Sequence, residues 1–372
     1  MDGISYVVVF PTVFAKNKIP QLIINIKNIL RIQNQGFKSV KRDGNIILVD
    51  ANDPVFSSST INLLFGIEKI AIARRVKNDF QKIILEIAIV GGNLLLKGEK
   101  FLVKVEGVST GFFTKDVEIA ATSNIIEKKA QIGAHPGTEE NFDKLLYTYL
   151  TKNNAYVCIF LDNGQGGVPI QSQNKNVICS VYDEISAISC FETIKQGFNP
   201  KIIICYRKKS ELMNLVKMIN QIIPRLIKQE ITLDFFNIKM NQTGAKNYLV
   251  FVNSILEIML HEAKINKINH ISIALSPLLF STKFIDYSVN LIFQNKGLPV
   301  MPLNGVDTKL FEEAKEIGLE KHIPKLEKLF TINSDQIPNP SSKDMDLAIK
   351  SKKSITVKVG PNNIHDILDS LE

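Results

Sequence analysis

The sequence predicts a multidomain protein, with α+β folding in its first half and an α/β doubly wound parallel sheet in its second half. The chain has 372 residues, enough for two or three domains of about 100–200 residues each. Hydrophobic residues make up 45% and charged residues 22%, a balance typical of packed globular proteins and not of disordered chains. The element pattern changes after the glycine-rich segment Asn163–Pro169, where short strands begin to alternate with helices.

Residues 1–62 form the first predicted domain. Its expected elements are a strand at Tyr6–Phe10, a helix at Ile19–Ile32 with apolar residues at helical spacing, and strands at Phe37–Lys41 and Asn45–Val49. The dipeptide Asp43-Gly44 predicts a tight turn, which makes the last two strands a hairpin. One amphipathic helix on a three-stranded antiparallel sheet predicts a ferredoxin-like unit. The segment Pro54–Thr60 has loop composition and marks either the domain boundary or a helix entry.

Residues 63–170 form the second predicted domain, an α+β block. Its expected elements are strands at Ile67–Val76, Lys100–Glu106 and Ala155–Leu161, and helices at Asp79–Ile89 and Asp116–Gln131. The segment Asn163–Pro169 is expected to be a flexible turn that closes this block.

Residues 171–330 form the third predicted domain. Four short strands rich in β-branched residues are expected at Val177–Tyr182, Lys201–Tyr206, Ile231–Ile238 and His270–Pro277, separated by helices that include Ser210–Lys228 and Tyr248–Asn266. This alternation predicts a parallel sheet, whose ligands bind at the carboxyl ends of the strands. Residues 331–372 are expected to be a tail with a strand at Ser354–Val359 and a helix at Asn363–Leu371.

The cysteines and histidines indicate no metal site and no catalytic residue. Cys158, Cys179, Cys190 and Cys205 form no Cys-x-x-Cys pair, and buried free thiols are the simplest interpretation. The five histidines are scattered and match no hydrolase or metalloprotease pattern. The apolar stretch from Tyr6 to Ala15 contains Pro11 and is too short for a membrane helix of about 20 residues. The prediction is a cytosolic protein without membrane contact.

Four collinear segments carry a resemblance to a known family. They are Phe10–Lys16, Leu64–Ile70 with Lys100–Val105, Gly166–Pro169, and Leu298–Asp307 followed by Phe311–Gly318. Together they resemble the tRNA 4-thiouridine synthetases, sulfurtransferases in which a ferredoxin-like domain and a THUMP domain precede an ATP pyrophosphatase domain of the PP-loop type. The resemblance implies that residues 63–170 are a THUMP domain and that residues 171–330 are the PP-loop domain.

The loop that binds ATP in that family is altered in this chain. The resemblance implies a Ser-Gly-Gly-x-Asp-Ser loop after the first strand, in which glycines let backbone N–H groups approach phosphate. The corresponding residues are Ser180, Val181, Tyr182, Asp183, Glu184 and Ser186. Both glycines are absent, and two acids stand where a helix N-terminus should attract phosphate. Asp183 and Glu184 are interpreted as a helix cap and first-turn charges.

Two further departures concern lysine and sulfur. The resemblance implies a lysine directly after Asp307, but Thr308 stands there and Lys309 follows it. It also implies a sulfur-carrying cysteine after Gly318, yet no cysteine follows Cys205. Persulfide transfer needs an accessible thiolate. The prediction is therefore no catalytic residue and no cofactor, with ATP and Mg²⁺ bound only if the divergent loop still works.

The net charge of +8 favours a polyanionic partner, and the resemblance implies the tRNA acceptor region. Candidate phosphate contacts are Lys16, Lys18, Lys41, Arg42, Arg74, Arg75, Lys77, Lys104 and Lys115. Such contacts require cations on one face of the protein. For any one of them, a solvated surface charge is the competing interpretation. A second copy of the chain, giving a homodimer, is left open as a partner.

Three functions therefore stay open. The first is a tRNA-binding protein with a degenerate nucleotide domain, a pseudoenzyme. The second is an active tRNA sulfurtransferase that uses a divergent ATP loop. The third is a protein interaction module that has lost both activities. The missing glycines favour the first over the second, and the basic loops favour the first over the third.

Overall fold

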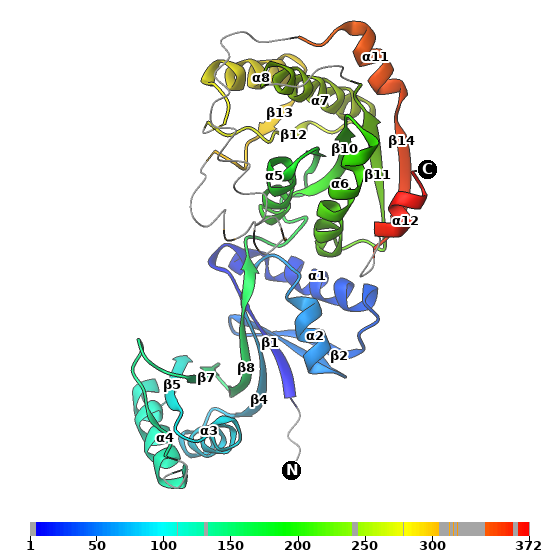
Figure 1. Ribbon diagram of the computed structural model, residues 1–372. Helices are drawn as coiled ribbons and strands as arrows, with labels where there is room; N and C mark the ends of the chain where they lie inside the picture. Colours follow the sequence, from blue (N-terminus) through cyan, green and yellow to red (C-terminus); the bar gives the residue numbers. More distant parts are fainter. Residues whose placement is uncertain are drawn as a thin grey trace. The chain divides into compact units, whose positions relative to one another are not determined.

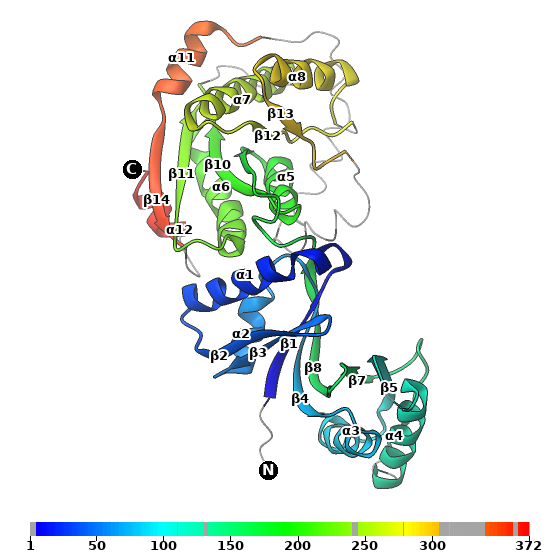
Figure 2. The ribbon, with the colours of Figure 1, turned by 180° about the vertical axis from the view of Figure 1, so that it is seen from behind.

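The computed structural model describes residues 5–109, 111–129, 133–239, 245–277, 279–304, 339–359 and 364–371, with residues 312, 315 and 318. The chain divides into two compact units, Met1–Pro169 and Ile170–Glu372. Figures 1 and 2 show both units as ribbons from opposite sides. Each unit is described by itself.

The first unit contains one mixed eight-stranded sheet in the order β2-β3-β1-β4-β8-β7-β5-β6. Its strands are β1 (Ser5–Pro11), β2 (Phe37–Asp43), β3 (Ile46–Ala51), β4 (Ile67–Lys77), β5 (Lys100–Gly107), β6 (His135–Pro136), β7 (Lys144–Leu150) and β8 (Asn154–Gly166). Its helices are η1 (Val13–Lys18), a 3-10 helix, and the α-helices α1 (Ile19–Ile32), α2 (Pro54–Ile61), α3 (Phe80–Leu94) and α4 (Thr114–Lys129). The sheet is continuous across the two domains predicted for residues 1–170, and the boundary after residue 62 stays a prediction.

Local signals explain most of these elements. Helix α1 begins with a proline in its first turn, and its buried residues recur at helical spacing, as a helix on a sheet requires. The predicted hairpin is confirmed: β2 pairs antiparallel with β3, and Gly44 has φ +63°, a conformation that glycine adopts without strain. Of the two expectations for Pro54–Thr60, a boundary loop or the start of a helix, the helix is confirmed. The Asp53 side chain caps α2 by accepting hydrogen bonds from its first N–H groups.

Two expectations for this unit are corrected. Asn163–Gly166 is not a flexible turn, because Asn163 pairs with Lys69 and Gly166 with Ile67, which extends β8 along β4. Strand β7 was not expected, although it pairs with both β5 and β8.

One face of this sheet is packed by helices and the other by strands alone. Helices α3 and α4 bury a core against β5, β7 and β8 that includes Ile87, Val103 and Ile125. Alternate strand residues point to opposite faces, and the opposite face has its own core. The residues of that core come from strands only, among them Val8, Ala73, Tyr147 and Tyr156. We call this face the strand-only face.

The sheet curls on itself around the strand-only face. Phe10 of β1 and Tyr149 of β7 have ring centroids 5.2 Å apart, although two strands lie between them in the sheet order. A flat sheet would place β1 and β7 about 14 Å apart, at 4.8 Å per strand. The Tyr156 hydroxyl of β8 likewise donates to Asp43 Oδ2 of β2 at 2.5 Å. The curl therefore buries tyrosine rings in a concave surface.

The second unit contains a six-stranded sheet in the order β13-β12-β9-β10-β11-β14. Its strands are β9 (Asn176–Val181), β10 (Asn199–Tyr206), β11 (Glu230–Asn237), β12 (His270–Ser272), β13 (Leu298–Val300) and β14 (Lys353–Lys358). Its helices are α5 (Glu184–Lys195), α6 (Lys209–Ile222), the 3-10 helix η3 (Ile223–Arg225), α7 (Ala245–Asn266), α8 (Thr282–Gln294), α11 (Ser342–Lys350) and α12 (Ile364–Asp369).

The predicted doubly wound parallel arrangement is confirmed for this sheet. Strands β9 to β13 run parallel, and only β14 is antiparallel. Helices α5 and α6 pack on one side and α7 and α8 on the other, as Figure 1 shows. The strand order reverses at β9, which lies between β12 and β10. The predicted strand His270–Pro277 is shorter than expected and ends at Ser272.

A buried charge network fastens β14 to β11. Asp234 of β11 is 1% exposed. Its carboxylate accepts a hydrogen bond from Ser354 Oγ at 2.6 Å and lies 2.7 Å from Lys201 Nζ and 3.3 Å from Lys352 Nζ. Lys352 also contacts the buried Glu262 of α7 at 2.8 Å. Burial alone would raise the pKa of Asp234, but the hydrogen bonds and charges of these partners lower it below its usual value.

Candidate functional site

The loop between β9 and α5 occupies the switch point of the second sheet, where α/β proteins bind ligands. Tyr182 is 7% exposed and packs edge-on against Phe251 of α7, with ring centroids 5.8 Å apart. Its side chain therefore fills the space beyond β9. The cavity lined here by Ser180, Tyr182 and residues of α7, of α8 and of the segment after β12 is about 20 Å³. That volume holds about one water molecule, whereas ligand pockets are typically about 300–1,000 Å³.

The backbone donors of this loop are already bound within the protein. The N–H groups of Tyr182 and Asp183 both donate to Ser186 Oγ, at 2.8 and 2.9 Å. The N–H of Ser186 donates to Asp183 Oδ1 at 2.9 Å. These are the groups that a phosphate-binding loop offers to its anion at a helix N-terminus. Asp183 is the N-cap of α5, which confirms the interpretation of its carboxylate as a cap.

The second oxygen of Asp183 is held from another helix. Tyr248 of α7 donates its hydroxyl to Asp183 Oδ2 at 2.6 Å, and its ring stacks on Phe280. Burial raises the pKa of Asp183, while the hydrogen bonds from Tyr248 and Ser186 oppose this rise. The Asp183 carboxylate thus occupies the N-terminus of α5. Its negative charge would repel an external phosphate there, and its hydrogen-bond donors are already in use.

The four cysteines offer no accessible thiolate. All four side chains are buried. Burial raises the pKa of the Cys158 thiol to about 12 and that of Cys205 further. The pKa of Cys190 is raised by a hydrogen bond with Cys179 and by burial. A protonated thiol out of reach of solvent is a poor nucleophile. The positions Asp307, Thr308 and Lys309 lie outside the described residues.

The structure divides the nine predicted RNA contacts among several surfaces. Arg75 and Lys77 lie on β4 with their side chains on the strand-only face, since Arg75 pairs with Tyr156 and its guanidinium lies 4.8 Å from the centre of the Tyr6 ring. Lys41 lies on the same face, because it pairs with Leu48. Lys104 of β5 pairs with Tyr147 there and contacts Glu106 at 3.7 Å.

Sequence reasoning missed one cation on this face. Lys69 Nζ lies 5.5 Å from the centre of the Tyr147 ring, a cation–π distance. Lys69, Arg75 and Lys77 are separated by even numbers of residues in β4, so strand alternation places them on one face. That period of two was available in the sequence for these three residues, while strand pairing adds Lys41 and Lys104 to the same face. We call the patch of Lys41, Lys69, Arg75, Lys77 and Lys104 the basic rim.

The remaining five candidates lie elsewhere. Arg74 points to the opposite face of β4 and forms an ion pair with Glu86 of α3 at 3.2 Å. Arg42 alternates away from Lys41 and donates to the carbonyl oxygen of Gly44 at 2.6 Å. Lys115 pairs with Glu118 on α4 at 2.8 Å. Lys16 and Lys18 are exposed on η1. The adjacent residues Arg74 and Arg75 therefore lie on opposite faces of the sheet and cannot contact the same stretch of RNA.

The described residues include neither a metal-binding cluster nor a membrane-spanning helix. No group of three or more His, Cys, Asp or Glu side chains among them is arranged to hold a metal ion. None of their helices has both the length and the apolar character needed to cross a membrane.

Comparison with known proteins points to one group. No protein-family model matches the chain. A probable tRNA sulfurtransferase of Methanosarcina acetivorans is 23% identical over 186 residues, which are 50% of this chain and 45% of that protein. Its counterpart in Methanosarcina mazei is 22% identical over 178 residues, 47% of this chain and 44% of the relative. The matched region thus spans less than half the length of these curated relatives.

Two solved structures share the fold over most of the chain. The protein PH1313 of Pyrococcus horikoshii matches 85% of this chain and 100% of its own, with a TM-score of 0.65 and 16% identity. A 4-thiouridine synthetase, solved with RNA and bound ATP, matches 95% of this chain and 100% of its own, with a TM-score of 0.64 and 14% identity.

Proposed function

Because the chain is a distant relative of the tRNA sulfurtransferases, we propose that it is a tRNA-binding protein whose nucleotide domain no longer activates ATP. In this proposal the first unit comprises a ferredoxin-like and a THUMP domain, and the second is a degenerate PP-loop domain. Its partner is the acceptor region of tRNA, and its location is the cytosol.

One observation carries the loss of nucleotide chemistry. Ser186 accepts hydrogen bonds from both backbone N–H groups that follow β9, and Asp183 caps the helix that follows. A phosphate would have to break these contacts and approach the half-buried Asp183 carboxylate, which Coulomb repulsion disfavours. The 4-thiouridine synthetase solved with RNA and bound ATP supports the ancestry of the site, and the filled loop supports its loss of function.

RNA binding is supported by the basic rim. Its five cations gather on the strand-only face, and none of the described helices covers the core there. Cations on one face neutralise consecutive phosphates and release counterions, which gives an affinity that falls with salt. Recognition by shape needs few contacts to bases.

We expect the purified chain to bind tRNA with micromolar or tighter affinity, and the double variant Arg75→Gln/Lys77→Gln to bind several-fold more weakly. Each lost phosphate contact should reduce the slope of log affinity against log salt by about one. Fluorescence anisotropy with labelled tRNA at several salt concentrations measures both quantities.

The matched control is Lys82→Gln/Lys97→Gln, which removes the same charge from two exposed lysines on and after α3. Equal weakening by the two double variants would show only a general charge effect. A wild-type chain with no preference for tRNA over a random single strand would refute the proposal in favour of an interaction module.

A further inference from the structure

The amino ends of the parallel strands in the second unit border two adjoining cavities. One, of about 500 Å³, lies where β12 and β13 begin and is lined by residues that include Asn269, Ile271 and Gly297. The other, of about 310 Å³, lies where β9, β10 and β11 begin and is lined by Asn176, Asn199 and Glu230 among others. Ile268 lines both. We call these two cavities together the amino-edge groove.

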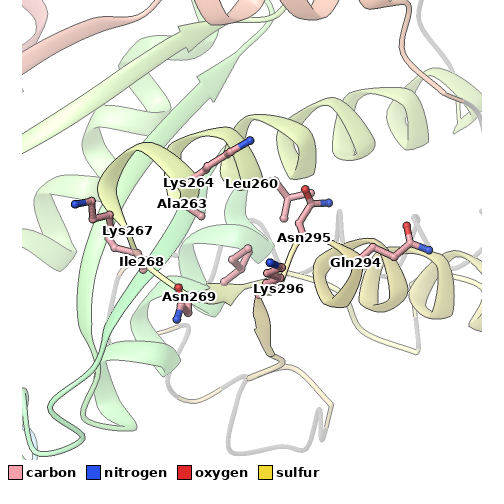
Figure 3. Close-up of a pocket in the computed structure, with 11 residues that line it drawn as sticks. Leu260, Ala263, Lys264, Lys267, Ile268, Asn269, Gln294, Asn295 and Lys296 are labelled. Carbon is pink, nitrogen blue, oxygen red and sulfur yellow. The ribbon is translucent and has the colours of Figure 1, made fainter.

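Positive charge dominates the groove. Glu230 is the one carboxylate among the lining residues. The groove is also lined by five lysines, which are Lys201, Lys228, Lys264, Lys267 and Lys296. Figure 3 shows Lys264 and Lys267 at the end of α7, with Asn295 and Lys296 on the other side, after α8. Asp234 offsets the charge of Lys201. None of the other four lysines forms an ion pair with a described carboxylate.

Two titratable groups at this edge have lowered pKa values, chiefly because of burial and secondly because of a neighbouring lysine. Burial lowers the pKa of Lys228, and the charge of Lys201 lowers it further. Burial lowers the pKa of His270 at the start of β12, and the charge of Lys175 adds to this effect. Lys175 directly precedes β9, the strand that pairs with β12. A bound anion would offset this excess positive charge.

The length of the groove favours an extended ligand. It crosses the beginnings of five neighbouring parallel strands, from β13 to β11. Four strand spacings of about 4.8 Å correspond to about 19 Å. A nucleic acid strand advances about 3.4 Å per phosphate along its helix axis, so several consecutive phosphates fit this span. Amide side chains such as Asn199 and Asn269 supply neutral donors along it.

We propose that the amino-edge groove binds consecutive phosphates of an RNA backbone. It lies at the opposite end of the strands from the Ser180–Ser186 loop, so RNA held there does not enter the filled nucleotide site. The inference rests on RNA binding by the chain and adds a second contact surface, on a unit that lacks the basic rim.

A competing structural role must be separated by the test. Lys264 lies in the last turn of α7, and Lys267 and Lys296 follow α7 and α8 with φ of 54° and 61°. Cations at these positions also stabilise a helix by offsetting its C-terminal partial charge. That role predicts a change in thermal stability without RNA, whereas the proposed role predicts a change in RNA affinity.

The test compares two triple variants of the full chain. The groove variant is Lys228→Gln/Lys264→Gln/Lys296→Gln, and the matched control is Lys209→Gln/Lys217→Gln/Lys350→Gln, from exposed positions of α6 and α11. We expect the groove variant to bind tRNA at least tenfold more weakly than the control. Its salt slope should fall by about three, at about one per lost phosphate contact. Equal affinities would overturn the proposal, even if the groove variant melts at a lower temperature.

Lysine acetylation followed by mass spectrometry gives a second readout on the wild-type protein. Bound tRNA should protect Lys228, Lys264 and Lys296 from acetylation and leave Lys209 and Lys217 reactive. Protection by inorganic tripolyphosphate and not by tRNA would assign the groove to a small anion and overturn the RNA proposal. If the basic-rim variant loses affinity while the groove variant matches its control, only this inference fails. If wild-type protein does not bind tRNA, the proposed function fails with it.

Discussion

No 4-thiouridine is expected when the chain is incubated with tRNA, ATP, Mg²⁺ and either a persulfide donor or sulfide. Thiolation by this route needs a phosphate site to activate the uridine carbonyl and an accessible sulfur nucleophile. The described residues meet neither need. The N–H groups of Tyr182 and Asp183 in the loop after β9 are bound to Ser186, and the four cysteine thiols are buried. Mass spectrometry of digested tRNA measures the product, and the yield should equal that of the reaction without protein.

Binding measurements separate the two causes. Calorimetry with ATP and Mg²⁺ should detect no complex with a dissociation constant below about 100 µM, equivalent to about −5.5 kcal/mol. Restoring both glycines, at Val181 and Tyr182, should not confer activity, since the Asp183 carboxylate, its contact with Tyr248 and the Ser186 hydroxyl stay in place. A tight ATP complex, or product that disappears on mutation of Cys179 or Asp183, would identify the chain as an active, divergent enzyme.

The second large effect is on stability. Asp234→Ala should lower the free energy of unfolding by about 3–5 kcal/mol, because it leaves the Lys201 ammonium group and the Ser354 hydroxyl without their buried partner and leaves Lys352 with Glu262 alone. Chemical denaturation followed by circular dichroism measures the change. Asp286→Ala, at an exposed position of α8, is the matched control and should change stability by less than about 0.5 kcal/mol. Equal effects at the two positions would contradict the importance of the network.

The same carboxylate predicts a pH dependence. Because the folded protein lowers the pKa of Asp234 below its usual value of 3.8, its stabilising contribution is fully present above that value. The contribution is lost as the pH falls through the lower folded pKa. The stability difference between wild type and Asp234→Ala should therefore shrink below about pH 4. A difference that stays constant from pH 7 to pH 3 would show that charge plays no part.

The sequence predicted those features that depend on residues close together in the chain. Helix Ile19–Ile32, the Asp43-Gly44 turn and the cap at Asp183 follow from apolar spacing, backbone preference and an acidic side chain before a helix. Loss of the glycines at Val181 and Tyr182 was also visible. Strand β7 was missed because it is buried in the middle of the sheet between β5 and β8, and a short apolar run does not reveal its partners.

Contacts between residues far apart in the chain could not be predicted from the sequence. Tyr248 holds Asp183 from 65 residues away, and the curl that brings Tyr156 to Asp43 joins residues 113 apart. Neither contact leaves a local signal. The grouping of cations was partly accessible: a strand over Ile67–Val76 was predicted, and its alternation already separates Arg74 from Arg75.

The position of β14 has a consequence for synthesis of the protein on the ribosome. Thr232 of β11 and its β14 neighbour Thr356 are 124 residues apart in the chain. At about 5–20 residues per second, β11 waits about 6 to 25 seconds for the strand that covers its edge. During that time its unpaired backbone groups and apolar side chains are a template for pairing with another nascent chain. We therefore expect slow or interrupted translation of the segment between them to increase aggregation of this protein in cells.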